Sequence, residues 1–167
     1  MTWSIIVVWV GLVVLWFWWK TGSVAIALDA PGAVATMIEY LVTNGVNRSE
    51  LRFRVRGDRT RQIVLTKYTD GVITRLRGSV NEHADNRQGF AAIKDALKGQ
   101  SIPYALKGES RDSKYVEIDF GSDLTVAERV VRLAFSRGFN AEIERDGLAY
   151  FKHVITGAVA GPTAEAK

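Results

Sequence analysis

The sequence of 167 residues contains no cysteine and only two histidines, His83 and His153. The absence of cysteine excludes disulfides, thiolate metal sites and cysteine nucleophiles, although it does not distinguish an oxidising compartment from a reducing one. Neither histidine has a carboxylate or a second histidine at a spacing typical of a metal site. The glycine-rich phosphate-binding motifs, the nucleophile elbow and the zinc-protease motif are also missing. We therefore expect no cofactor, no metal, no small-molecule substrate and no enzymatic activity.

Charged side chains are absent from the first 19 residues, which are almost entirely apolar. As a helix this segment would be about 28 Å long, close to the thickness of the bilayer hydrocarbon. The sequence therefore predicts a single transmembrane helix over residues 1–20. Its interfacial anchors would be Trp3 at one end and Trp18, Trp19 and Lys20 at the other.

Few residues indicate how this segment is oriented in the membrane and whether it is cleaved. Lys20 is the first basic residue, so we expect a single-pass protein of the inner (cytoplasmic) membrane, with its soluble domain in the cytoplasm. The alternative is a cleaved signal peptide, because residues 25–27 resemble a cleavage site. No basic residue precedes the apolar run, however, and signal peptides usually carry one there.

Small and aromatic residues recur at heptad spacing within the predicted span. Ser4 and Gly11 form one pair, and Trp9 and Trp16 form another. Small residues allow a neighbouring helix to approach closely, and an indole N–H near the middle of a membrane requires a partner. These four residues are predicted to pack on other membrane-protein subunits; the alternative is an anchor that faces lipid only.

Beyond the span, composition divides the chain into a connector (residues 21–28), one domain (residues 29–153) and a flexible tail (residues 154–167). Apolar residues at helical spacing predict helices over residues 29–45, 85–98 and 125–138. Alternating patterns and turn residues predict strands over residues 51–56, 61–68, 72–77, 102–107, 114–120, 141–145 and 148–152.

From residue 72 onward, the order of these elements is that of a ferredoxin-like, split βαβ antiparallel sheet. The predicted fold class is therefore α+β: a transmembrane helix, then a ferredoxin-like domain with an additional N-terminal helix and β-hairpin. The expected strand order, 4-1-3-2, would place oppositely charged residues on neighbouring strands. These are Glu142 and Glu144, then Arg75 and Arg77, then Glu117 and Asp119. Salt bridges explain the carboxylate pairs more simply than a shared proton or a bound cation does.

Basic residues are concentrated between residues 48 and 77, where nine Lys or Arg face three Asp or Glu, while the net charge of the whole chain is +4. Strand alternation and the adjoining turn predict a patch that binds an anionic partner or lipid, formed by Arg52, Arg54, Arg56, Arg59 and Arg61. Its candidate ligands are anionic lipid headgroups or an acidic protein. Nucleic acid is less favoured, because the aromatic pattern of an RRM is missing around residues 51–55. The arginines could also serve only to protect an exposed strand edge from aggregation.

These features together favour a non-catalytic accessory or assembly subunit of a larger, bacterial-type integral-membrane complex, whether respiratory, photosynthetic or secretory. The alternative function is a membrane-tethered adaptor or sensor that binds an anionic ligand, lipid or RNA. A tethered enzyme would need a pocket that gathers Glu117, Asp119 or His83.

Overall fold

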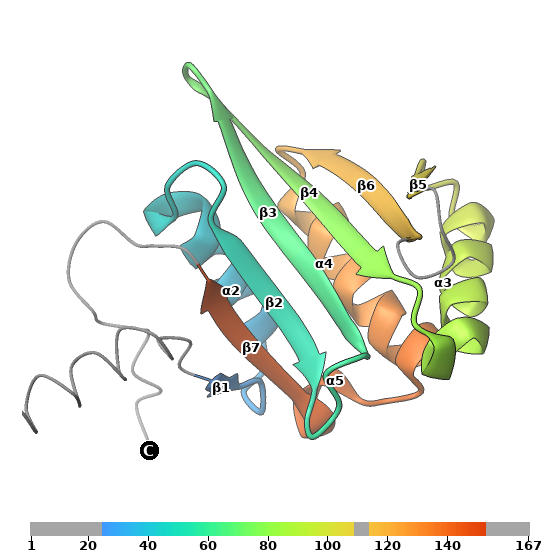
Figure 1. Ribbon diagram of the computed structural model, residues 1–167. Helices are drawn as coiled ribbons and strands as arrows, with labels where there is room; N and C mark the ends of the chain where they lie inside the picture. Colours follow the sequence, from blue (N-terminus) through green and yellow to red (C-terminus); the bar gives the residue numbers. More distant parts are fainter. Residues whose placement is uncertain (1–24, 109–113, 153–167) are drawn as a thin grey trace, which may run out of the picture.

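The structure is a computed structural model that describes residues 25–108 and 114–152. In these residues the chain forms an α+β domain around one seven-stranded sheet, in which every neighbouring pair of strands is antiparallel. The strands are β1 (Ala25–Ala27), β2 (Glu50–Val55), β3 (Gln62–Asp70), β4 (Ile73–Asn81), β5 (Ala105–Lys107), β6 (Tyr115–Gly121) and β7 (Gly147–Lys152). Across the sheet their order is β1-β7-β2-β3-β4-β6-β5 (Figure 1).

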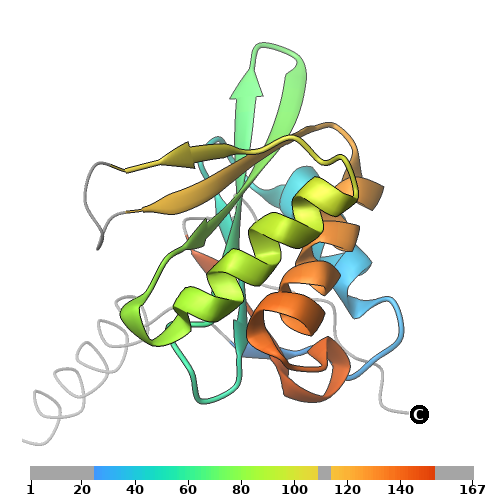
Figure 2. The same cartoon turned by 90° about the vertical axis from the view of Figure 1, so that its right-hand side faces the viewer.

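Three helices cover one face of this sheet (Figure 2). They are α2 (Ala33–Asn44), α3 (Arg87–Gly99) and α4 (Leu124–Leu133). The described chain also contains a short 3-10 helix, η1 (Ala84–Asn86), a π-helical turn, η2 (Ala134–Phe139), and a fourth α-helix, α5 (Ile143–Asp146). Each long helix buries one apolar stripe; in α3 this stripe is Phe90, Ile93 and Leu97.

The strands place alternate residues in the core, because successive side chains point to opposite faces of a sheet. In β2, Leu51, Phe53 and Val55 are buried under the helices, whereas Arg52 and Arg54 point the other way and are half-buried. We call the face opposite α2, α3 and α4 the open face. Among the described elements, no helix packs on it (Figure 2).

The sheet topology corrects the predicted ferredoxin-like order. As predicted, β6 lies between β4 and β5, the two strands that α3 connects. The hairpin of β2 and β3, however, is inserted between β4 and β7, so the expected 4-1-3-2 arrangement is interrupted. β7 in turn lies between β1 and β2, the strands that α2 connects. N-terminal and C-terminal segments are thus interleaved in a single sheet.

The segment predicted as a strand over residues 141–145 is also different, since it contains the helical turn α5. The backbone N–H of Asp146 donates to the carbonyl of Glu142 at 2.7 Å, and the Asp146 carboxylate accepts from the Glu142 N–H at 3.1 Å. These two bonds close the turn. Glu144 therefore pairs with Arg132 of α4 rather than with an arginine of the sheet, and this hydrogen bond lowers the pKa of Glu144.

The predicted transmembrane helix requires a correction as well. None of the helices in residues 25–108 and 114–152 combines the length and the apolar character that crossing a membrane requires. The longest, α3, has 13 residues and would span only about 20 Å. The described structure is the α+β domain alone, and it supports neither the single-pass helix nor the inner-membrane localisation that depended on it. The accessory subunit of a membrane complex stays a prediction. The residues predicted as its packing and anchoring positions lie outside the described residues; they are Trp3, Ser4, Trp9, Gly11, Trp16, Trp18, Trp19 and Lys20.

Candidate binding site on the open sheet face

The register of the strands arranges the side chains of the open face in rows that run across the sheet. One row crosses the middle and consists of Tyr150, Arg52, Val64, Ser79 and Glu117. The row on one side of it consists of Lys152, Glu50, Thr66, Arg77 and Asp119. On the other side lie Leu148, Arg54 and Gln62, and, on the far strands, Asn81, Tyr115 and Lys107. Aromatic, basic and amide side chains are therefore brought together on this face from six strands.

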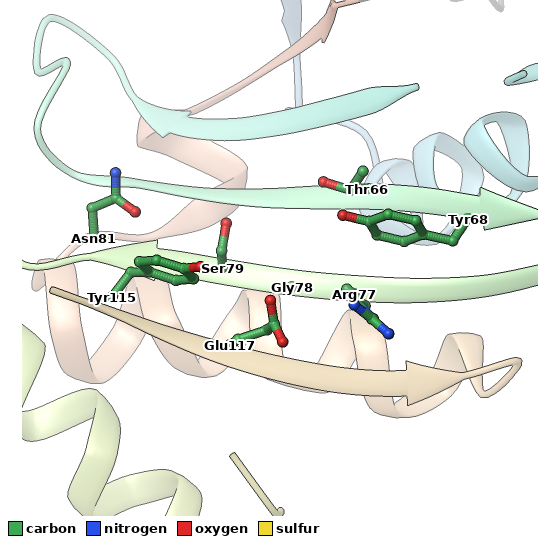
Figure 3. A pocket seen from close by; sticks show the side chains of 8 residues that line it. All are labelled: Thr66, Tyr68, Arg77, Gly78, Ser79, Asn81, Tyr115 and Glu117. Carbon is green, nitrogen blue, oxygen red and sulfur yellow. The ribbon is translucent and has the colours of Figure 1, made fainter. Parts of the chain in front are cut away.

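A hollow of about 310 Å³ lies on the open face over β3, β4 and β6. Tyr68 and Tyr115 stand at its two ends, and the small residues Gly78 and Ser79 lie between them (Figure 3). Its other lining residues are Thr66, Arg77, Asn81 and Glu117. The short side chains in the middle make a shallow depression between two aromatic rings.

Arg77 is stacked on one of these rings. Its guanidinium carbon lies 4.9 Å from the centroid of the Tyr68 ring, and its Nε lies 3.8 Å from a carboxylate oxygen of Asp119. The register of β4 and β6 shifts between Leu76 and Arg77, and such irregularities re-aim the neighbouring side chains. Asp119 is also held by the backbone N–H of Gly121, which donates to it at 2.9 Å. Tyr68, Arg77 and Asp119 thus form a connected cluster, of which Tyr68 and Arg77 line the hollow.

Glu117 is held from the edge strand. Lys107 Nζ lies 2.7 Å from its carboxylate, and this interaction raises the pKa of Lys107. The two carboxylates that could have acted as a general acid and base, Glu117 and Asp119, therefore both lie beside basic groups. The third candidate, His83, precedes η1, and in the described residues no group of three His, Cys, Asp or Glu could hold a metal ion.

A second stacked pair lies on the β7 side of the open face. The guanidinium carbon of Arg54 is 4.7 Å from the centroid of the Tyr150 ring. Gln62 is the cross-strand partner of Arg54 in the β2–β3 ladder. Arg54 Nε and Gln62 Oε1 are buried atoms, and neither has a hydrogen-bond partner. A donor and an acceptor are therefore left unsatisfied next to each other, which costs free energy unless a ligand or water pairs with them.

The five predicted arginines do not form one patch. Arg52 and Arg54 lie on the open face, whereas Arg56, Arg59 and Arg61 lie in the loop between β2 and β3. Arg52 is paired with Glu50 at 2.7 Å. Arg56 and Arg59 are exposed.

Arg61 serves the structure of its own loop. It lies 2.8 Å from Asp58, and its guanidinium also donates to the carbonyl of Phe139 at 3.0 Å. Burial opposes ionisation of Asp58, but hydrogen bonds from Thr60 and Arg61 outweigh it, and the pKa of Asp58 is lowered. Arg61 therefore connects the β2–β3 loop to η2.

Sequence reasoning missed the aromatic part of this site. Tyr68, Tyr115 and Tyr150 are far apart in the chain, and each belongs to a different strand. Each does occupy an outward position of an alternating strand, which is the signal that could have identified it. Arg77 was singled out only as a salt-bridge residue, although it also stacks on Tyr68.

Comparison of the chain with protein-family models, with curated proteins and with solved structures gives no significant match.

Proposed function

We propose that this protein is a non-catalytic binding module and that its open sheet face holds an anionic ligand. The observation that carries the proposal is a set of basic side chains without acidic partners. Glu50, Glu117 and Asp119 are each matched by a basic residue. After this pairing, three basic residues of the open face form no ion pair within the described chain; they are Arg54, Arg75 and Lys152.

The position of these groups supports binding more than structural stabilisation. Arg75 and Lys152 are exposed, so neither is needed to neutralise a buried carboxylate. The Arg54 guanidinium carbon lies over the Tyr150 ring, and this contact favours one position of the side chain before any ligand arrives. A side chain held in this way loses less conformational entropy on binding. Arginine also matches phosphate and carboxylate with two parallel hydrogen bonds.

The neighbouring chemistry supports a binding role rather than a catalytic one. Glu117, which lines the hollow, and Asp119 on the same strand are each next to a basic side chain. A general base must reach a substrate proton, whereas these carboxylates already contact a basic group. The polar residues around them provide positioned donors and acceptors, as ligand sites require.

Titration of the full-length chain with inorganic polyphosphate, followed by calorimetry, tests this function. Polyphosphate is expected to bind, and the double variant R54A/R75A is expected to bind about 3- to 30-fold more weakly, because each of the two charges contributes at most about 1 kcal/mol. R129A is the matched control, since Arg129 is exposed on α4 on the other side of the domain. Absence of binding, or equal weakening by R129A, would refute the proposal.

A further inference from the structure

We infer that the ligand of the open face is single-stranded nucleic acid, whose bases stack on the tyrosine and arginine side chains of this face. This inference rests on the proposed function and names the anionic ligand. It revises the expectation from sequence, which disfavoured nucleic acid because residues 51–55 lack an RRM pattern. The sheet supplies aromatic residues from other strands instead.

Three tyrosines mark the extent of the surface. Tyr150 lies on β7, Tyr68 on β3 and Tyr115 on β6, and two strand spacings separate each from the next. With neighbouring strands roughly 4.8 Å apart, the rings are distributed over about 20 Å across the sheet. Along the strands, Tyr68 is offset by four residues from the row of Tyr150, and Tyr115 by two residues in the opposite direction, so a single strand would follow a bent path to meet all three rings. Aromatic side chains on an open sheet are a common platform for unpaired bases.

Two of the rings already carry a planar cation. Arg54 lies over Tyr150, and Arg77 lies over Tyr68. Guanidinium planes also stack on bases, so each pair offers both a flat surface and a positive charge close to a phosphate. In duplex nucleic acid the bases are stacked on each other and cannot reach such rings. The geometry therefore selects single strands.

The unsatisfied atoms of Arg54 and its cross-strand partner Gln62 distinguish a nucleic acid from a simple polyanion. Arg54 Nε requires an acceptor, and Gln62 Oε1 requires a donor. A phosphate offers acceptors only and would leave Gln62 unpaired. The edge of a base offers donors and acceptors side by side. Ser79 and Asn81, on the floor and rim of the hollow, add further groups of the same kind.

Fluorescence anisotropy of labelled oligouridylate with the full-length chain tests the inference. Oligouridylate is expected to bind, and Y68A and Y150A are each expected to weaken it about 5- to 150-fold, because stacking of one base is worth about 1–3 kcal/mol. Y68F and Y150F keep the ring and are expected to bind within about twofold of the unchanged chain. Both tyrosines point away from the helices, and the phenylalanine variants control for any loss of folding.

Parallel titrations with polyphosphate and with poly-glutamate separate the inference from the proposed function. Y68A is expected to leave polyphosphate binding unaltered, whereas Y150A also frees Arg54 and is expected to weaken it no more than R54A/R75A does. If oligouridylate binding is as insensitive to Y68A as polyphosphate binding, the nucleic-acid inference is wrong while the anion-binding function stands. If poly-glutamate binds more tightly than oligouridylate, the occupant is an acidic protein and the inference is overturned. If none of the three polymers binds, the proposed function itself fails.

Discussion

Lys67 is a charged residue at a position of β3 where strand alternation predicts an apolar one. It follows Ile63 and Leu65 on the helix-facing side of β3, where an apolar residue is expected, and it is only 8% exposed. Its Nζ donates to the carbonyl of Val42 at 2.5 Å and to that of Gly45 at 2.6 Å. These carbonyls lie at the C-terminal end of α2, where helix carbonyls lack partners within the helix and a positive charge is favourable. Lys67 thus joins β3 to the end of α2.

Replacing Lys67 with methionine keeps much of the side-chain volume and removes both hydrogen bonds. We expect K67M to lower the free energy of unfolding by about 1–3 kcal/mol, because two buried carbonyls lose their donor. Urea unfolding followed by circular dichroism measures this change. K98M is the control, since Lys98 is exposed near the end of α3, and its effect should stay within about 0.5 kcal/mol. Equal stability of the two variants would show that Lys67 does not stabilise the helix end.

Single residues were predictable from sequence where the signal is local. Alternation correctly indicated that Arg52 and Arg54 share a strand face; Leu51 and Phe53 are buried on the opposite face. The acceptors of Lys67 were not predictable, because they lie more than 20 positions away on another element. The same distance in sequence concealed the contact of Arg54 with Tyr150.

At the scale of elements, the close packing of α3 against η2 depends on two glycines. A Cβ on Gly89 would lie 1.9 Å from the carbonyl oxygen of Gly138. A Cβ on Gly138 would lie 2.2 Å from Cγ1 of Ile93, which is fully buried. The predicted helix over residues 125–138 ends at Gly138, but the chain continues as the π-helical turn η2 to Phe139. This turn is capped by Asn140, whose φ is 50°. Gly138 is therefore required for close packing rather than for helix termination.

Adding one methyl group at this contact tests the interpretation. We expect G138A to lower the free energy of unfolding by about 1–3 kcal/mol, because the buried Ile93 side chain has little room to move. G99A is the matched control, since a Cβ at Gly99, the last residue of α3, meets no atom within 4 Å. This control should be neutral or more stable by up to about 1 kcal/mol. Thermal unfolding of the two variants compares them directly, and a neutral G138A would contradict the packing role.

Elements were predictable where several apolar residues repeat at one spacing, as in α3, and less so where the pattern is short. Residues 141–145 alternate like a strand, yet Ile143 is the only apolar side chain of α5 that is buried there. One buried residue cannot distinguish a strand from a helical turn.

The first residues of α4 also differ from what their local pattern indicates. Thr125 and Glu128 have the spacing of a capping box, whereas it is the side chain of Asp123 that accepts from the N–H of Val126 at 3.0 Å.

At the scale of the whole molecule, the order of strands creates the candidate site. The β2–β3 hairpin enters the sheet between β7 and β4 and brings Arg54 next to Tyr150 on one side and Tyr68 next to Arg75 on the other. The sequence predicted the hairpin but not its insertion, because pairing between distant strands depends on the path of the chain rather than on local preference. Without the insertion, the two arginine–tyrosine pairs would not share this surface.

The most direct test of ligand binding by the open face is an amide NMR titration of the full-length chain with inorganic polyphosphate. Binding at this face predicts that chemical-shift changes are concentrated on β7, β2, β3 and β4, with the largest near Arg54 and Arg75, and that α2 and α4 change little. Saturable changes confined to the helices or to the loop of residues 56–61 would contradict this account, because the ligand would then occupy another surface.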